Sequence, residues 1–183
     1  MVQNISGEEN EADEAAPDNK RARCGTCIHH IFAAYDPEGD RKEMVEMAGR
    51  IIEGMGLADE LPSPESVISS AAQFFDWLKR MCGDGTPLCE LPVVMRQDDG
   101  TIIRGEMDLV WELSNGKLVL VDYKSFHGSD SLEGITAHAI QQGYPSQLKA
   151  YKDTLESVQG AGGQVQYVFI YYFVLGVVVK LEL

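Results

Sequence analysis

Basic residues are scarce in this chain: 15 lysines and arginines stand against 29 aspartates and glutamates among 183 residues. The formal net charge at pH 7 is -14. Six acids lie in the first nineteen residues, and leaving them out still gives about -8. Such a protein lacks the basic footprint that usually holds nucleic-acid phosphates. Any function on a nucleic acid would work best if another module delivered the strand, although the acidity equally fits an ordinary solvated surface.

Long apolar runs are missing as well. No stretch of eighteen consecutive apolar residues occurs, which excludes an ordinary membrane-spanning helix. The first residues are acidic and polar, unlike a secretory leader, so we expect a cytoplasmic protein. With 44% hydrophobic residues the chain can bury one sizeable core. We therefore expect a disordered acidic segment over residues 1–20 and a single domain over residues 21–183.

The four cysteines all precede residue 90. Cys24 and Cys27 have a spacing that suits a metal, and Cys82 and Cys89 form a second pair. A cytoplasmic setting favours reduced thiols at all four positions. We interpret them as reduced cysteines.

Two predicted strands are joined by a short turn. Arg104–Leu113 and Lys117–Lys124 have strand composition, and Ser114–Gly116 between them supplies turn residues, with glycine where a positive φ is wanted. The run Leu118–Val121 is continuously apolar, which indicates a strand buried on both faces. These segments predict a hairpin inside the domain.

The length of the turn decides which side chains face each other. A three-residue loop pairs Leu113 with Lys117 and sets Asp108 opposite Asp122. A two-residue turn would instead set Asp108 opposite Tyr123. We predict the three-residue loop, which brings the two acids together.

The preceding hairpin repeats this arrangement. Predicted strands over Glu90–Gln97 and from Thr101 onward flank the turn Asp98–Gly100, and their register sets Glu90 opposite Asp108. Three acids would then lie in a row across three strands. A row of like charges is destabilising unless something positive lies among them, and a divalent cation with oxygen ligands fits best.

Lys124 follows Asp122 by two residues and therefore shares its face of the strand. Two carboxylates can hold a divalent cation against a phosphate, and a nearby lysine can orient water or stabilise the charge that develops. A lone acid on a strand is usually a solvated residue. An acid that ends a buried strand is hard to explain in that way, so the pattern indicates a metal-dependent nuclease site.

Apolar spacing and turn residues predict the remaining elements. Two helices are predicted over Met44–Met55 and Leu132–Ile140. A third helix begins at Ser63 and Pro64 and runs to Leu78, and a fourth begins at Pro145 and buries Leu148, Leu155 and Val158. The predicted last strands are Val165–Val174 and Val177–Leu183.

Four motifs in this order resemble the RecB-type branch of the PD-(D/E)XK nucleases, found at the C-terminus of the AddA and RecB helicase-nuclease subunits. The motifs are Gly25-Thr26-Cys27-Ile28-His29, Gly105-x-x-Asp108, Val119-Leu120-Val121-Asp122-Tyr123-Lys124-Ser125 and Tyr144-x-x-Gln147-Leu148-x-x-Tyr151. The resemblance spans roughly residues 21–180. It implies an α/β fold with a restriction-endonuclease-like core, in which α-helices flank a mixed central β-sheet.

The resemblance also implies roles for residues. It makes His29, Asp108, Asp122 and the main-chain carbonyl of Tyr123 metal ligands, and Lys124 the catalytic lysine. The histidine lies in the family's Gly-Thr-x-x-His helix start.

Further residues are assigned less specifically by the resemblance. Gln147 and Tyr151 would contact the substrate or brace the site, and Glu90 would bind the metal through water or support the site. His30 is the alternative to His29, because the two are adjacent.

The resemblance finally implies a function. The expected activity is Mg2+-dependent hydrolysis of DNA, with Mn2+ as a substitute, by an exonuclease in double-strand break repair and recombination. The expected partners are a single DNA strand, a helicase motor in the same native chain and a second helicase-nuclease subunit. Relatives with an iron-sulfur cluster carry three cysteines after the catalytic lysine, so none is expected here. The alternatives are a stand-alone RecB-like or phage-type exonuclease, and a catalytically silent DNA-binding or structural domain.

Overall fold

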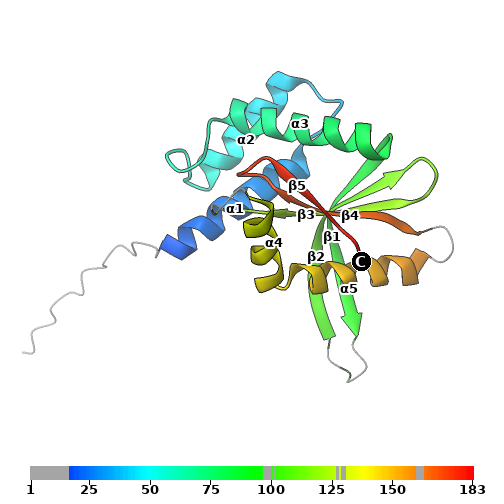
Figure 1. The fold of residues 1–183 in the computed structure, drawn as a ribbon. Coiled ribbons are helices and arrows are strands. Elements are labelled where there is room, and N and C mark those ends of the chain that lie inside the picture. Colours follow the sequence, from blue (N-terminus) through cyan, green and yellow to red (C-terminus); the bar gives the residue numbers. More distant parts are fainter. Residues whose placement is uncertain (1–16, 97–99, 101, 127, 129–130, 160–162) are drawn as a thin grey trace, which may run out of the picture.

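The computed structural model describes residues 17–96, 100, 102–126, 128, 131–159 and 163–183 (Figure 1). The helices are α1 (Pro17–Ala34), α2 (Arg41–Gly54), α3 (Pro64–Cys82), α4 (Leu132–Gln141) and α5 (Tyr144–Gln159). The strands are β1 (Gly85–Arg96), β2 (Ile102–Leu113), β3 (Leu118–Lys124), β4 (Val165–Tyr172) and β5 (Val177–Leu181). Within the described ranges, no helix combines the length and the apolar character needed to cross a bilayer.

The five strands form one mixed sheet in the order β1-β2-β3-β4-β5. β3 and β4 are parallel, and every other neighbouring pair is antiparallel. The parallel pair needs a crossover, which α4 and α5 supply by passing over one face of the sheet. The predicted α/β fold with a mixed central sheet between helices is confirmed.

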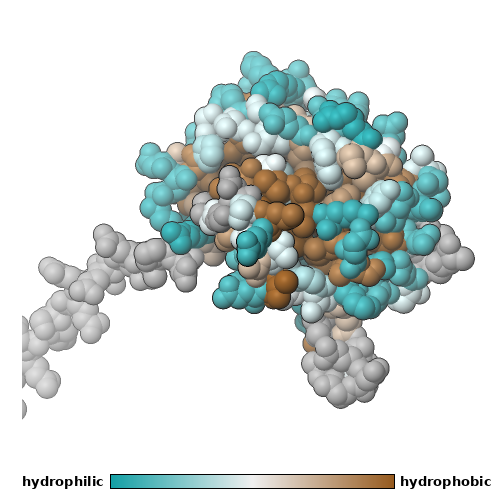
Figure 2. Space-filling model, in the orientation of Figure 1, coloured by the Kyte–Doolittle hydropathy of each residue, from teal (hydrophilic) through white to brown (hydrophobic). Residues whose placement is uncertain are grey.

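Two apolar cores cover the two faces of the sheet. The first packs α1, α2 and α3 against one face and includes Phe74, Trp111 and Tyr123, while the second packs α4 and α5 against the other. Figure 2 shows apolar side chains gathered at the centre of one face of the molecule, over the region of α1, α4 and β5 in Figure 1. This three-layer arrangement buries β3 almost completely.

Helix boundaries follow local capping. The side chain of Ser63 accepts a hydrogen bond from the Ser66 amide, as its position before Pro64 predicts.

α1 begins at Pro17, so the end of the segment expected to be disordered is helical; residues 1–16 lie outside the described part. On α5 the prediction for Val158 is wrong, because 79% of this side chain is exposed and Tyr151 takes a buried position instead.

β1 begins at Gly85, five residues before its predicted start. Pro87 lies inside the strand, which is possible because β1 is at the edge of the sheet and needs no amide donor on its outer side. The predicted register of the β1-β2 hairpin is confirmed by the pairs Cys89 with Leu109 and Leu91 with Met107. Asp98 and Asp99 of its predicted turn lie outside the described residues.

The β2-β3 hairpin has the predicted three-residue loop. The Leu113 amide donates to the Lys117 carbonyl oxygen over 2.9 Å, and Gly116 has a φ of 78°. The ladder then runs to the pair Leu109 with Val121. Continued by one position, this register sets Asp108 opposite Asp122, as the three-residue loop predicts.

Gly105 on β2 lets α5 approach the sheet closely. A Cβ atom at this position would lie 2.5 Å from the hydroxyl oxygen of Tyr151. The residue Tyr151 is itself only 4% exposed. The same hydroxyl accepts a hydrogen bond of 3.0 Å from Gln147 Nε2. The glycine of the Gly105-x-x-Asp108 motif is therefore explained by packing against α5.

We expect Gly105→Ala to destabilise the protein by about 1–3 kcal/mol, because the new methyl group meets the Tyr151 ring in a packed interface. Urea unfolding followed by circular dichroism measures this. Gly54→Ala is the matched control, since its Cβ would meet no atom within 4 Å and alanine favours the helix. Equal stabilities for the two variants would contradict the packing role of Gly105.

Candidate active site

The Asp108 side chain on β2 contacts two other elements, the helix α1 and the backbone of β3. Its Oδ1 lies 3.2 Å from Nδ1 of His29 on α1, and its Oδ2 accepts a hydrogen bond of 2.6 Å from the Tyr123 amide on β3. The carboxylate therefore takes the place of a backbone partner where the β2-β3 ladder ends. Both oxygens are fixed by these contacts, and the side chain cannot swing freely.

His29 reaches the sheet from the second half of α1. The expectation that this histidine marks a helix start is wrong, because α1 begins at Pro17. The ring lies edge-on to Tyr123 and Phe173, with centroids 5.8 and 6.4 Å apart. Burial lowers the pKa of His29, but the hydrogen bond and negative charge of Asp108 outweigh burial and raise it overall. His30, the alternative, is exposed.

Asp122 and Lys124 form a buried ion pair on β3. Lys124 Nζ lies 2.5 Å from Asp122 Oδ2, with side chains 18% and 4% exposed respectively. Lys124 is the partner of this oxygen, and no further donor among the described residues contacts it. Burial raises the pKa of Asp122 to about 6, against the opposing charge of Lys124.

Tyr144, to which the sequence motifs give no individual role, also contacts the site. It opens α5, and its ring lies under the ammonium group of Lys124, with Nζ 4.7 Å from the ring centroid. Its place in the Tyr144-x-x-Gln147 motif was the available signal. Burial lowers the pKa of Lys124, but the Asp122 carboxylate outweighs burial and raises it, so the lysine is a cation at neutral pH.

Glu90 lies at the position that the register predicts, but its side chain does not join the site. The pairs on either side of it are regular, whereas Glu90 has a φ of 49° and is exposed. The ladder of β1 and β2 is interrupted at Glu90 and Asp108, between the pairs Cys89 with Leu109 and Leu91 with Met107. The expected row of three acids is therefore irregular at Glu90, whose side chain is exposed to solvent.

Gln147 and Tyr151 lie on one face of α5, as predicted, and bond to each other. In the described structure their side chains are not bonded to His29, Asp108 or Lys124. Tyr151 instead packs against Gly105, three residues before Asp108 on β2. Its contacts favour the bracing role over direct chemistry.

The donors present fit a divalent cation. One imidazole nitrogen from α1 and the carboxylates of Asp108 and Asp122 from β2 and β3 lie close enough to act on one another. As they stand, these groups contact one another, and no three His, Cys, Asp or Glu side chains of the described residues are spread around a metal position. A cation would replace the contact of His29 with Asp108. At Tyr123 the observed contact is made by the amide, whereas the carbonyl was the predicted ligand.

Comparison with known proteins gives one family match for this chain. A family model described as the PD-(D/E)XK nuclease superfamily matches residues 4–178. No curated protein matches the chain. The match covers the helix that carries His29, both acid-bearing strands and α5.

The raised pKa of Asp122 makes metal binding depend on pH. Because the folded-state value of about 6 exceeds the ordinary 3.8, the metal-free fold loses stability as the pH rises between these values. A cation needs the ionised carboxylate and a neutral His29, so excess Mn2+ should raise the unfolding temperature more at about pH 8 than at about pH 5. At a hundred times its Kd, Mn2+ would add about 2.7 kcal/mol.

Thermal unfolding with and without Mn2+ measures this difference. Asp122→Asn should abolish the Mn2+ effect at both pH values, whereas Asp153→Asn, at an exposed carboxylate on α5, should preserve it. An equal stabilisation at both pH values in the unmodified protein would contradict the assignment.

Proposed function

The chain belongs to the PD-(D/E)XK nuclease superfamily, and from this premise we propose that it hydrolyses DNA phosphodiester bonds with a divalent cation held by His29, Asp108 and Asp122. The observation that carries the proposal is the joint placement of these ligands and Lys124. Four side chains from α1, β2 and β3 meet in two contacts of 3.2 and 2.5 Å. An arrangement of this kind has no evident structural purpose, because a buried acid with a raised pKa costs stability.

Each residue has a distinct part in the proposed mechanism. His29, Asp108 and Asp122 would hold the cation, which when bound lowers the pKa of a water molecule and polarises the phosphate. The Tyr123 amide fixes one oxygen of Asp108 and thereby directs the other. Lys124, positioned by Asp122 and the Tyr144 ring, supplies a fixed positive charge for the negative charge that develops on the phosphate.

Gln147 and Tyr151 support this centre from α5 in the proposal, through the contact of Tyr151 with Gly105. Glu90 is exposed, so we give it only a role through water or substrate. A silent nuclease-like domain is the less favoured function, since the acid, acid and lysine set is intact.

The finer assignment is an exonuclease that receives a single DNA strand from a helicase motor and acts in double-strand break repair. It rests on the RecB-type motifs and on the net charge of -14, which makes unaided capture of DNA unfavourable. Mg2+ is the proposed cation and Mn2+ its substitute. In this proposal the motor is part of the same native chain, and a second helicase-nuclease subunit completes the complex.

Lys124→Ala should lower the cleavage of linear single-stranded DNA in the presence of Mg2+ by at least about a hundredfold, because it removes the fixed charge beside the phosphate. Asp122→Ala should abolish cleavage through loss of the cation. Lys149→Ala is the control, since Lys149 forms an exposed ion pair with Asp153 on α5. Cleavage that survives in both site variants would refute the proposed function.

The acidic surface generates a separate prediction about affinity. In the absence of divalent cations and at physiological salt, the chain should bind a fluorescent single-stranded oligonucleotide with a Kd weaker than roughly 1 μM. Fluorescence anisotropy measures this value. Tight binding by the chain alone would remove the reason for proposing delivery by a motor.

A further inference from the structure

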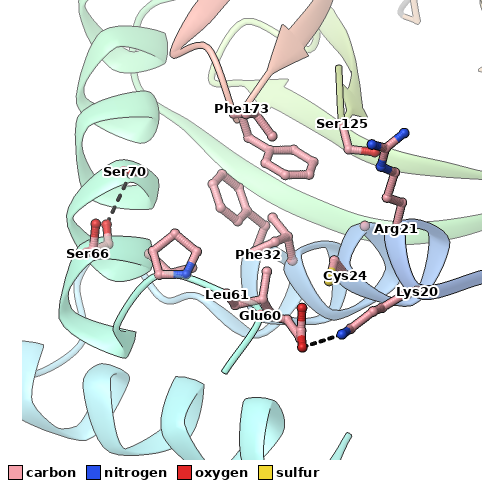
Figure 3. A pocket seen from close by; sticks show the side chains of 15 residues that line it. Lys20, Arg21, Cys24, Phe32, Glu60, Leu61, Ser66, Ser70, Ser125 and Phe173 are labelled. Carbon is pink, nitrogen blue, oxygen red and sulfur yellow. Dashed lines mark hydrogen bonds and ion pairs between the residues drawn. The ribbon is translucent and has the colours of Figure 1, made fainter. Parts of the chain in front are cut away.

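A large cavity opens beside the candidate active site, between α1, α3 and the turn that follows β4 (Figure 3). Its volume is about 710 Å³, which is within the range of sites that hold small organic ligands. The apolar part of its wall includes Ile28, Phe32, Val67 and Phe173. None of the residues assigned to metal binding or catalysis lines this cavity.

The cavity and the site share their supporting residues. Ser125 lines the cavity and directly follows Lys124, while Ile28 directly precedes His29. Phe173 lies edge-on to the His29 ring, so one aromatic side chain borders both spaces. Gly25 permits this proximity, because its Cβ position would lie only 3.4 Å from Ser125 Oγ. A molecule in the cavity would therefore lie next to a group bound at the metal site.

Chemistry differs between the two ends of the cavity. The rings of Phe173 and Phe32 lie near each other at one end, whereas Arg21 extends toward Ser125 at the other (Figure 3). Lys20 is paired with Glu60, but no carboxylate of the described residues pairs with Arg21. The cavity thus offers an aromatic face, a hydroxyl group and a guanidinium cation, for which the described side chains provide no carboxylate partner.

These features match one nucleotide of a single strand. We infer that the cavity receives the unstacked base of the nucleotide next to the scissile phosphate, with the base against Phe173 and its own phosphate near Arg21 and Ser125. Aromatic rings bind bases of any sequence through their faces, and arginine binds phosphate through its planar array of donors. The inference rests on the proposed nuclease function and adds a binding site for the base. An apolar peptide would leave the arginine without a partner.

The test uses DNA that lacks a single base. The chain is incubated with Mg2+ and a single-stranded oligonucleotide, and with the same oligonucleotide carrying one abasic residue; cleavage at each bond is then measured at nucleotide resolution. The unmodified protein should cleave the bond beside the abasic residue about tenfold more slowly than the same bond in ordinary DNA. Elsewhere along the two strands the rates should agree.

Variants of the cavity distinguish binding of the base from binding of the phosphate. Phe173→Leu keeps an apolar side chain but removes the ring, so it should cleave ordinary DNA about tenfold more slowly and lose the difference between the two substrates. Phe173→Tyr should restore that difference. Arg21→Ala should slow cleavage of both substrates equally, since both keep the phosphate. Val158→Ala, at an exposed position on α5, is the control and should leave all rates unchanged.

Because Phe173 also contacts His29, the Mn2+-induced rise in unfolding temperature is measured for each variant. If Mn2+ raises the unfolding temperature of Phe173→Leu as much as that of the unmodified protein, the slower cleavage is due to the cavity and not to the metal site. A reduced rise together with equally slowed cleavage of both substrates would assign Phe173 to the metal site and overturn the inference. The inference is also overturned if the unmodified protein cleaves both substrates alike, or if Phe173→Leu keeps the full difference. A protein that cleaves no DNA under these conditions refutes the nuclease function itself.

Discussion

The hydrogen bond from the Tyr123 amide to the Asp108 carboxylate is the contact on which the rest of the site depends. It lies where the regular ladder between β2 and β3 ends, and it holds an acidic side chain where a backbone carbonyl would otherwise accept. The second oxygen of the same carboxylate contacts His29, which ties the helix layer to the sheet. One carboxylate therefore sets the positions of a strand end, a neighbouring strand and a helix.

The local part of this arrangement could be predicted from the sequence. Turn residues fix the loop length, the loop fixes the register, and the register aligns Asp108 with Asp122. The non-local part could not be predicted in this way. The exposure of Glu90 depends on a backbone conformation that its residue type does not favour, and the contact of Tyr144 with Lys124 depends on where a crossover helix docks. The purpose of Gly105 likewise becomes visible only once Tyr151 lies against it.

The site opposes stability in a specific manner. Asp122 is almost fully buried, and one of its oxygens receives only the charge of Lys124. A carboxylate in such a position is costly when ionised, and the surrounding layers have to supply that free energy through their apolar cores. A divalent cation bound by Asp122 would offset part of that cost. Asp122 on β3 therefore lowers the stability of the fold while it serves the proposed site.

The position of His29 on the first described helix has a consequence for the order of folding. The hairpin that carries Asp108 and Asp122 is local in sequence, whereas the contact between His29 and Asp108 joins distant parts of the chain. Contacts between distant segments close later than local ones, because more chain entropy has to be lost. A chain in which only the hairpin has formed holds both acids and the lysine without the imidazole. Assembly of the proposed set of metal ligands is thereby coupled to completion of the tertiary structure, and the proposed chemistry would be confined to fully folded chains.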